Sequence, residues 1–180
     1  MSNKLKQLTW EHHQSAERRA FARDLLKGNV DPHKYYVFLV CQWHNYTVLE
    51  NAAIIPPHLN PIKRADRIMQ DIKELEEIHG FGMPSGLPQS VTDYKNHIGA
   101  LAEADDNQGL LAHMYTRHFG ELHGGQIIKK KAPGSGKMYE FDGDKEYLIE
   151  EFRKLLHDGM AEESKKCFTF ASQLFDELST

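Results

Sequence analysis

The sequence predicts an all-α protein that folds as a single domain over residues 1–180. Apolar residues recur at helical spacing in one segment after another. Prolines and glycines separate these segments, and no alternating pattern lasts long enough to predict a sheet. With 40% hydrophobic and 27% charged residues, the chain has the composition of a soluble globular protein with one core.

Caps and helix breakers define the elements of the first half. An amphipathic stretch opens the chain and ends near Gly28. The Asp31-Pro32 step combines an N-cap with a proline at the first helical position, so we expect a helix over residues 33–53. Prolines then end the helical pattern, and the next helix is expected over residues 62–78. These prolines are Pro56, Pro57 and Pro61.

Turn residues divide the second half in the same way. Residues 80–88 predict a loop, and a long glycine-interrupted helix follows residues 105–108. A turn-rich connector over residues 131–137 leads into residues 138–141, for which we expect an extended conformation. The remaining helices are expected over residues 90–102, 147–156 and 160–178.

The long helix carries glycines where helices usually avoid them. Gly124 and Gly125 each cost about 1 kcal/mol relative to alanine in a helix interior. Gly120 lies one turn before Gly124, so the two share a face that has no side chains. Such a face can bring the backbone against a flat ligand, and the Gly-Gly step allows a kink. Close helix packing, or a helix end at Gly124, explains the glycines equally well.

Charge and cysteine content exclude several classes of function. The net charge of −4 gives no support to nucleic-acid binding. No apolar run approaches the roughly 20 residues of a membrane-spanning helix, and no signal peptide opens the chain. Cys41 and Cys167 lie far apart, which favours a reducing cytoplasm over a disulfide framework. The basic runs 129–131 and 63–64 are typical of solvated helix ends, and a docking patch for an acidic electron donor is the alternative.

Eleven histidines raise the question of a metal site. His113, His118 and His123 follow one another at spacings of five residues, so each is rotated about 140° from the last. They therefore cannot converge on one zinc ion, and we expect no protein-ligated metal. His13 differs because Ala16 leaves the next turn low and Glu17, at i+4, can orient the ring by a hydrogen bond.

Two motifs and the last helix together resemble the heme oxygenase family. The segment HHQSAE matches the family's proximal-helix motif H-x-x-A-E at His13, Ala16 and Glu17. YTRHFGELHGGQ, residues 115–126, matches the distal-helix motif Y-T-R-x-x-G-D-L-x-G-G-Q. Residues 162–178 look like the family's last helix. The resemblance implies a heme-oxygenase-like helical bundle that holds heme between a proximal helix and a kinked distal helix, with His13 as the axial iron ligand.

The resemblance also implies roles for individual residues. One set of residues, the catalytic group, would order water and bound oxygen. A second set, the heme-binding group, would hold the macrocycle and its propionates. Each assignment has a structural alternative. Tyr46 could equally be a tyrosine of the core, and Phe168 and Phe175 could form an apolar stripe that packs in the core. Lys6, Tyr115 and Arg153, the proposed propionate contacts, could instead be solvated surface residues. The catalytic group is Glu121, Arg117, Tyr46, Thr116, Gly120 and Gly124. The heme-binding group is Lys6, His13, Glu17, Tyr115, Gly120, Gly124, Gly125, Arg153, Phe168 and Phe175.

The sequence departs from the family pattern at three positions. Glu121 replaces the usual aspartate of the distal helix, which puts catalytic efficiency in doubt. His123 replaces a small residue, and Ile149 stands where a second propionate-binding cation is often found, which puts heme orientation in doubt.

The activity implied is oxygen-dependent opening of heme b, which is both substrate and oxygen-activating cofactor. The products would be biliverdin, expected to be the IX-alpha isomer, carbon monoxide and ferrous iron. The chain has no flavin, nicotinamide or iron–sulfur motif, so a ferredoxin or flavin reductase would supply electrons, and a bilin reductase could follow. A soluble, cytoplasmic monomer is expected, without nucleic-acid or membrane partners. A heme carrier, or a helical interaction module whose glycines only pack helices, remains the alternative.

Overall fold

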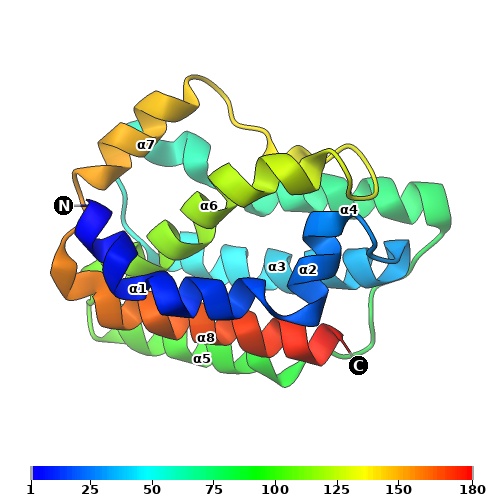
Figure 1. Cartoon of the computed structure of the whole chain (residues 1–180), viewed down its shortest axis with the longest axis horizontal. Coiled ribbons are helices and arrows are strands. Elements are labelled where there is room, and N and C mark those ends of the chain that lie inside the picture. The colour runs from blue at the N-terminus through cyan, green and yellow to red at the C-terminus, as the bar shows by residue number, and fades with distance from the viewer. Residues whose placement is uncertain (1, 180) are drawn as a thin grey trace.

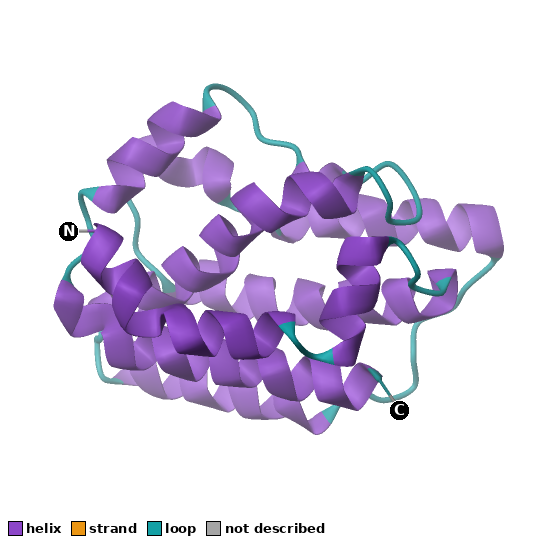
Figure 2. Ribbon diagram, viewed as in Figure 1, coloured by secondary structure: helices purple, strands orange, loops and turns teal. Residues whose placement is uncertain are grey.

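The computed structural model describes residues 2–179, and the side chains of residues 4–119 and 125–179. Helices make up all of the regular structure within these residues, which confirms the predicted all-α class (Figure 2). The α-helices are α1 (Ser2–Glu17), α2 (Ala20–Lys27), α3 (Pro32–Ala52), α4 (Ala65–His79), α5 (Gln89–Glu103), α6 (Asn107–Lys129), α7 (Lys145–Arg153) and α8 (Ala161–Leu178). The 3-10 helices are η1 (Pro57–Ile62), η2 (Lys137–Tyr139) and η3 (Asp158–Met160).

The first and last helices of the chain lie side by side in one layer of helices. The first helix, α1, packs along the last one, α8, and α5 packs on the other side of α8 (Figure 1). Helix α3 packs against α4 and α5, and α6 packs against both α3 and α8. Residues from α1, α3, α6 and α8 are therefore close in space although they are far apart in sequence.

Local capping explains several of the helix boundaries. Asp31 accepts hydrogen bonds from the backbone N–H groups of His33 and Lys34, so α3 begins where the sequence predicts. Gly80 ends α4 in the left-handed conformation that favours glycine. The bounds of α6 also exclude a helix end at Gly124.

Three expected boundaries are wrong. The amphipathic stretch that ends near Gly28 is two helices, because the chain breaks between α1 and α2. Helix α4 starts at Ala65 instead of residue 62, since the prolines form the 3-10 helix η1. Residues 137–139 form η2 instead of an extended segment. The carboxylate of Asp71 accepts hydrogen bonds from the N–H groups of Lys137 and Met138, and this tertiary contact stabilises the turn.

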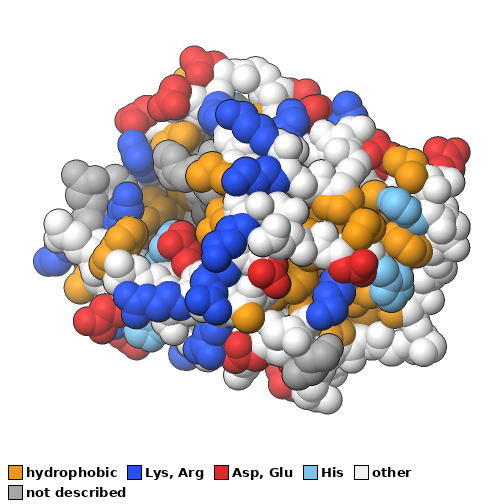
Figure 3. Space-filling model, turned by 45° about the vertical axis from the view of Figure 1, so that its right-hand side comes forward, with side chains coloured by type: hydrophobic (Ala, Val, Ile, Leu, Met, Phe, Trp, Pro, Cys, Tyr) orange, Lys and Arg blue, Asp and Glu red, His pale blue; other side chains and the backbone are white. Residues whose placement is uncertain are grey.

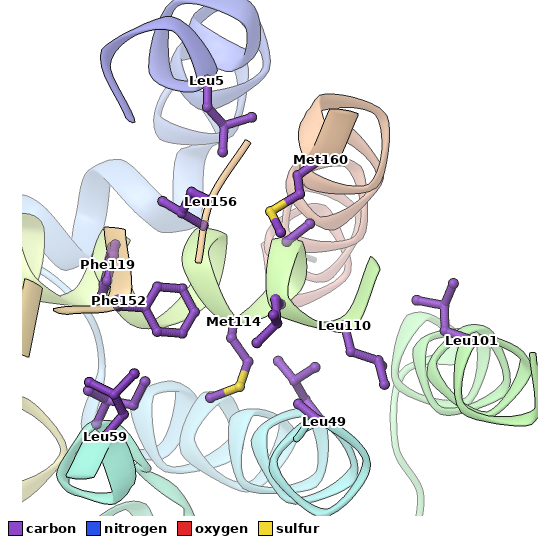
Figure 4. Packing of buried hydrophobic residues seen from close by; sticks show 14 of the residues in the cluster. Leu5, Leu49, Leu59, Leu101, Leu110, Met114, Phe119, Phe152, Leu156 and Met160 are labelled. Carbon is purple, nitrogen blue, oxygen red and sulfur yellow. The ribbon is translucent and has the colours of Figure 1, made fainter. Parts of the chain in front are cut away.

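Two hydrophobic clusters form the core. One lies among α3, α5, α6, α7 and α8, where Met114 is surrounded by side chains from several helices (Figure 4). Within it, the rings of Phe119 and Phe152 meet edge to face at 4.9 Å between centroids. The other cluster joins α2, α3, α4, η2 and the end of α8. Cys41 and Cys167 are both buried and free.

A buried carboxylate connects α3, α4 and α6. Glu50 of α3 accepts hydrogen bonds from the backbone N–H groups of Arg64 at 2.6 Å and Ala65 at 3.1 Å, so it caps the first turn of α4. Nε2 of His118 on α6 lies 2.8 Å from the same carboxylate. Burial would raise the pKa of Glu50, but these bonds together hold it below its ordinary value.

In the basic run at residues 63–64, Lys63 is exposed after the end of η1, as expected of a solvated helix end, whereas Arg64 is only 1% exposed. Its guanidinium donates to the backbone carbonyls of Pro61, Ile62, Met138 and Glu140 and stacks on the Phe141 ring. Arginine can be buried in this way because carbonyl oxygens accept from its five N–H donors. The segment from η2 onward is thereby attached to the start of α4.

No helix formed by the described residues is both long enough and apolar enough to cross a bilayer.

We predict that Glu50→Gln lowers the free energy of unfolding by about 3 kcal/mol, because His118 loses an anionic partner in the interior. The folded pKa of Glu50 lies below the ordinary 4.5. Its ionised form therefore stabilises the fold fully above that pH, and the contribution is lost as pH falls through the folded value. Denaturant unfolding from pH 7 to pH 3 should show the difference between wild type and variant shrinking. Glu103→Ala, on the exposed face of α5, is the matched control and should change stability by less than about 0.5 kcal/mol.

Candidate functional site

A cavity of about 150 Å³ lies among α1, α2, α3, α6 and α8. Its walls are mostly apolar, with a few polar groups from different helices, which is typical of a small-molecule site. The lining residues are His13, Ala16, Glu17, Ala22, Leu25, Leu26, Gln42, Tyr46, Thr116, Arg117, Gly125, Ile128, Cys167, Phe168, Ala171 and Phe175.

The wall formed by α1 presents a histidine with an oriented ring. His13 is partly exposed, its ring stacks on Trp10 at 5.3 Å, and Phe168 meets it edge to face. Its Nε2 lies 2.6 Å from the Glu17 carboxylate, the i+4 contact that the sequence predicts. Ala16 is buried beside it and adds no bulk to the cavity.

The opposite wall is formed by α6, with Tyr46 from α3. The hydroxyl of Thr116 donates to the carbonyl of Ala112 at 2.9 Å or pairs with Ser164 on α8 at 2.6 Å. Tyr46 is fully buried and donates to the backbone carbonyl of Arg117 at 3.1 Å. The hydroxyls of Thr116 and Tyr46 thus hold α6 to its neighbours.

Arg117 is the cavity's buried cation. It is 7% exposed, and its guanidinium carbon lies 4.1 Å from the centre of the Tyr94 ring. Within the described part of the chain, its Nε–H has no hydrogen-bond acceptor. An unpaired buried donor costs about 1–3 kcal/mol, so this atom is suited to a ligand oxygen or a water in the cavity.

The wall formed by α8 is a stripe of residues at helical spacing. Phe168 and Phe175 both line the cavity, as expected. Phe175 also packs on Phe21 at 6.1 Å, so the core interpretation of this residue holds as well. Cys167 and Ala171 complete the stripe, four residues apart, and this spacing could have identified them. Gln42 also lines the cavity, and its position four residues before Tyr46 on α3 could have identified it in the same way.

Other predicted site residues lie away from this cavity. Lys6 is exposed and sits over the Trp10 ring, and Arg153 pairs with Glu150. Tyr115 packs edge to face on Phe119, and burial raises its pKa although Arg153 opposes the shift. Ile149, where relatives often have a cation, is buried in the core. The side chains of residues 120–124, and with them the assignments of Gly120, Glu121, His123 and Gly124, lie outside the described residues.

The side chains around the cavity fit a heme: a histidine stands on one wall, aromatic rings stand on another, and a third carries a guanidinium donor for which the described residues supply no acceptor.

The fold and the cavity define an all-α protein with a largely apolar binding site that one histidine borders. The sequence model described as heme oxygenase matches residues 1–177. The chain therefore belongs to the heme oxygenase family.

Individual relatives agree with this assignment. The chain is 27% identical to heme oxygenase 2 of Macaca fascicularis over 99% of its own length, but it spans only 65% of that relative. It is 27% identical to the heme oxygenase of Porphyra purpurea, with 100% and 87% of the two chains covered. The solved heme oxygenase of Leptospira interrogans superposes with a TM-score of 0.82 at 26% identity, covering 96% and 97%. Heme oxygenase-1 of the cyanobacterium Synechocystis in complex with heme, at 23% identity, shares the fold with a TM-score of 0.83 over 98% and 90%.

We predict that Gly125→Ala lowers stability by about 1–3 kcal/mol, because a Cβ there would lie 2.6 Å from the Tyr139 ring. Gly99→Ala on α5 is the matched control, since nothing lies within 4 Å of its added Cβ. Helix propensity then favours the alanine by up to about 1 kcal/mol. Thermal unfolding should move the two variants in opposite directions. A shift in the same direction would mean that Gly125 does not depend on contact with Tyr139.

Proposed function

We propose that this protein is a heme oxygenase in activity as well as in family: it opens heme with oxygen and reducing equivalents to give biliverdin, carbon monoxide and ferrous iron. The observation that carries the proposal is the cavity in which His13 and Glu17 of α1 stand across from Arg117 of α6, beside the aromatic stripe of α8. Family membership over residues 1–177 supports it. Bound heme would supply the iron that activates oxygen and the ring that is oxidised.

His13 is the proposed iron ligand, and Glu17 is the group that orients it. One nitrogen cannot serve both partners, and Glu17 faces Nε2. Binding through Nε2 therefore requires the ring to flip so that Nδ1 faces Glu17, whereas a ring that keeps the present bond would bind through Nδ1. In either case the carboxylate can accept from the nitrogen that does not hold iron, which raises the basicity of the ligand.

Arg117 is the proposed hydrogen-bond donor inside the cavity. Its Nε–H has no acceptor among the described residues, whereas the hydroxyls of Tyr46 and Thr116 already have partners on the protein. We therefore assign to Arg117 the ordering of a water in the cavity, with Glu121 as the accepting carboxylate. Tyr46 and Thr116 would position α6, and Gly120 and Gly124 would let its backbone approach the heme.

An external protein must deliver the electrons. A band of lysine and arginine side chains crosses one face of the molecule (Figure 3). Of the basic run at residues 129–131, Lys129 pairs with Glu140 and Lys131 with the carbonyl of Leu26, while Lys130 is exposed. Such a surface would attract an acidic ferredoxin or a flavin reductase. The IX-alpha isomer, heme b, a monomeric cytoplasmic state and a subsequent bilin reductase belong to the same proposal.

The direct test is to mix the purified protein with hemin and then add oxygen and a reductant. We expect a shifted Soret band followed by bilin absorption. A shifted Soret band without bilin absorption would indicate a heme carrier. No Soret shift would indicate that the glycines of α6 only allow helices to pack closely.

We predict that His13→Ala still takes up heme through the apolar walls but opens the ring about tenfold or more slowly. His12→Ala is the matched control because it removes the neighbouring imidazole, turned about 100° around the same helix. Soret spectra and bilin yield should change in the first variant and remain in the second. If His12→Ala abolished iron ligation and His13→Ala preserved it, the ligand assignment would be wrong.

We also predict that Glu121→Ala lowers the bilin yield, because the water loses its accepting carboxylate, whereas Glu121→Asp retains the yield. The longer glutamate has one more torsion than aspartate and holds a water less rigidly. Product spectra of both variants after addition of oxygen and reductant give the comparison. A yield in Glu121→Ala equal to that of the parent would transfer the role to Arg117 alone.

A further inference from the structure

A cluster of histidine and carboxylate side chains joins α5, α6 and α8. His97 of α5 and His113 of α6 each place Nε2 near one carboxylate oxygen of Glu163 on α8, at 2.8 and 2.9 Å. The three ligand atoms lie within 4.8 Å of one another. Spacing along α6 alone excludes a metal site shared by its histidines, but it says nothing of an imidazole supplied by another helix. Helix α5 supplies this second imidazole, that of His97, because α5, α6 and α8 pack against one another.

The donor set and its spacing suit a divalent transition-metal ion. Two imidazoles and one carboxylate are a common set for such ions, with a water in the remaining position. Bonds of about 2.0–2.2 Å in a tetrahedral arrangement place neighbouring donor atoms about 3.3 Å apart. The present distances of 2.8 and 2.9 Å are slightly shorter, so small side-chain rotations would admit the ion.

We propose that His97, His113 and Glu163 form a binding site for a first-row divalent transition-metal ion such as Zn²⁺. The site is separate from the cavity, because none of the three residues is among the described residues that line it.

The Glu163 carboxylate carries the negative charge that a metal ligand needs. The hydrogen bond from His113, together with those from His97 and Lys166, keeps its pKa well below the ordinary value, so the carboxylate is ionised at neutral pH. Lys166 contacts the other oxygen, Oε1, at 3.1 Å, which leaves the oxygen between the two imidazoles for the ion.

Tyr94 orients the buried histidine. Its hydroxyl lies 2.9 Å from Nδ1 of His113, and the His113 side chain is fully buried. When the ion occupies Nε2, the ring proton stays on Nδ1 and is donated to the Tyr94 oxygen, the arrangement that fixes the tautomer of a metal-bound imidazole. The side chains of His97 and Glu163 are 23% and 17% exposed, so an ion and its water can reach the site from solvent.

The competing interpretation is a hydrogen-bonded cluster that only ties the three helices together. Both interpretations predict that the protein folds without metal, and they differ in what metal does. A structural cluster would bind Zn²⁺ no better than a single exposed His–Glu pair. His58 and Glu151 form such a pair at 3.0 Å, so they provide the matched control.

The test is titration of the metal-free protein with Zn²⁺ by calorimetry, and with Co²⁺ by visible absorption, on wild type, His97→Ala, Glu163→Gln and His58→Ala. We expect one equivalent to bind to wild type and to His58→Ala. Affinity should fall at least tenfold in His97→Ala and in Glu163→Gln, and Mg²⁺ should not compete, because it prefers oxygen ligands. Circular dichroism verifies that each variant is folded.

Other outcomes would overturn the proposal. These are the absence of stoichiometric Zn²⁺ binding by wild type, unchanged affinity in either site variant, an equal loss in His58→Ala, or effective competition by Mg²⁺. Hemin is absent from the experiment, so failure here would not bear on the proposed heme chemistry, and failure there would not bear on this site.

Discussion

The carboxylate of Glu50 is the point on which the arrangement of α3, α4 and α6 depends. It caps the start of α4 and binds His118 of α6, so a single buried anion fixes one helix end and one helix face. Nδ1 of His118 also lies 3.1 Å from the carbonyl oxygen of Met114, so both ring nitrogens have partners within the protein. His118 therefore sets the rotation of α6 about its axis. The next residue back, Arg117, is turned about 100° from it and lines the cavity.

Two buried arginines differ in the groups that surround their guanidinium side chains. Arg64 and Arg117 are both almost fully buried. The guanidinium of Arg64 donates to several backbone carbonyls, which stabilise its charge and attach η2 to α4. Arg117 lies against aromatic faces and retains an unpaired Nε–H beside the cavity. The charge of Arg64 is satisfied by the fold, whereas Arg117 keeps one donor for which the described residues supply no acceptor.

The sequence predicted what depends on local chemistry and missed what depends on tertiary contact. Asp31, Gly80 and the apolar periodicities are local signals, so the helices themselves were predicted well. The η2 turn is capped by Asp71 from another helix, and a propensity for extended structure could not reveal that. The different directions of His113 and His118 on α6 follow from their spacing of five residues, but the partner of His113 could not be predicted in this way. His97 is sixteen positions earlier and on another helix.

Histidine–glutamate pairs recur through the described structure, and their surroundings decide what each can do. The pair of His118 and Glu50 is buried, and all its bonds end on protein atoms, so it can only hold helices. His13 and Glu17 form a partly exposed pair at the rim of an apolar cavity. Breaking that pair costs little, because exposed pairs contribute only about 0–1 kcal/mol, and an incoming metal centre would replace the lost contact. At Glu163 a second imidazole, that of His97, joins the pair with His113, and both His97 and Glu163 are partly exposed to solvent. These two features make the cluster a candidate coordination site. The same two residue types therefore pack helices in one place and, in the roles proposed for them, orient a cofactor or bind a metal ion in others, according to exposure and the number of converging donors.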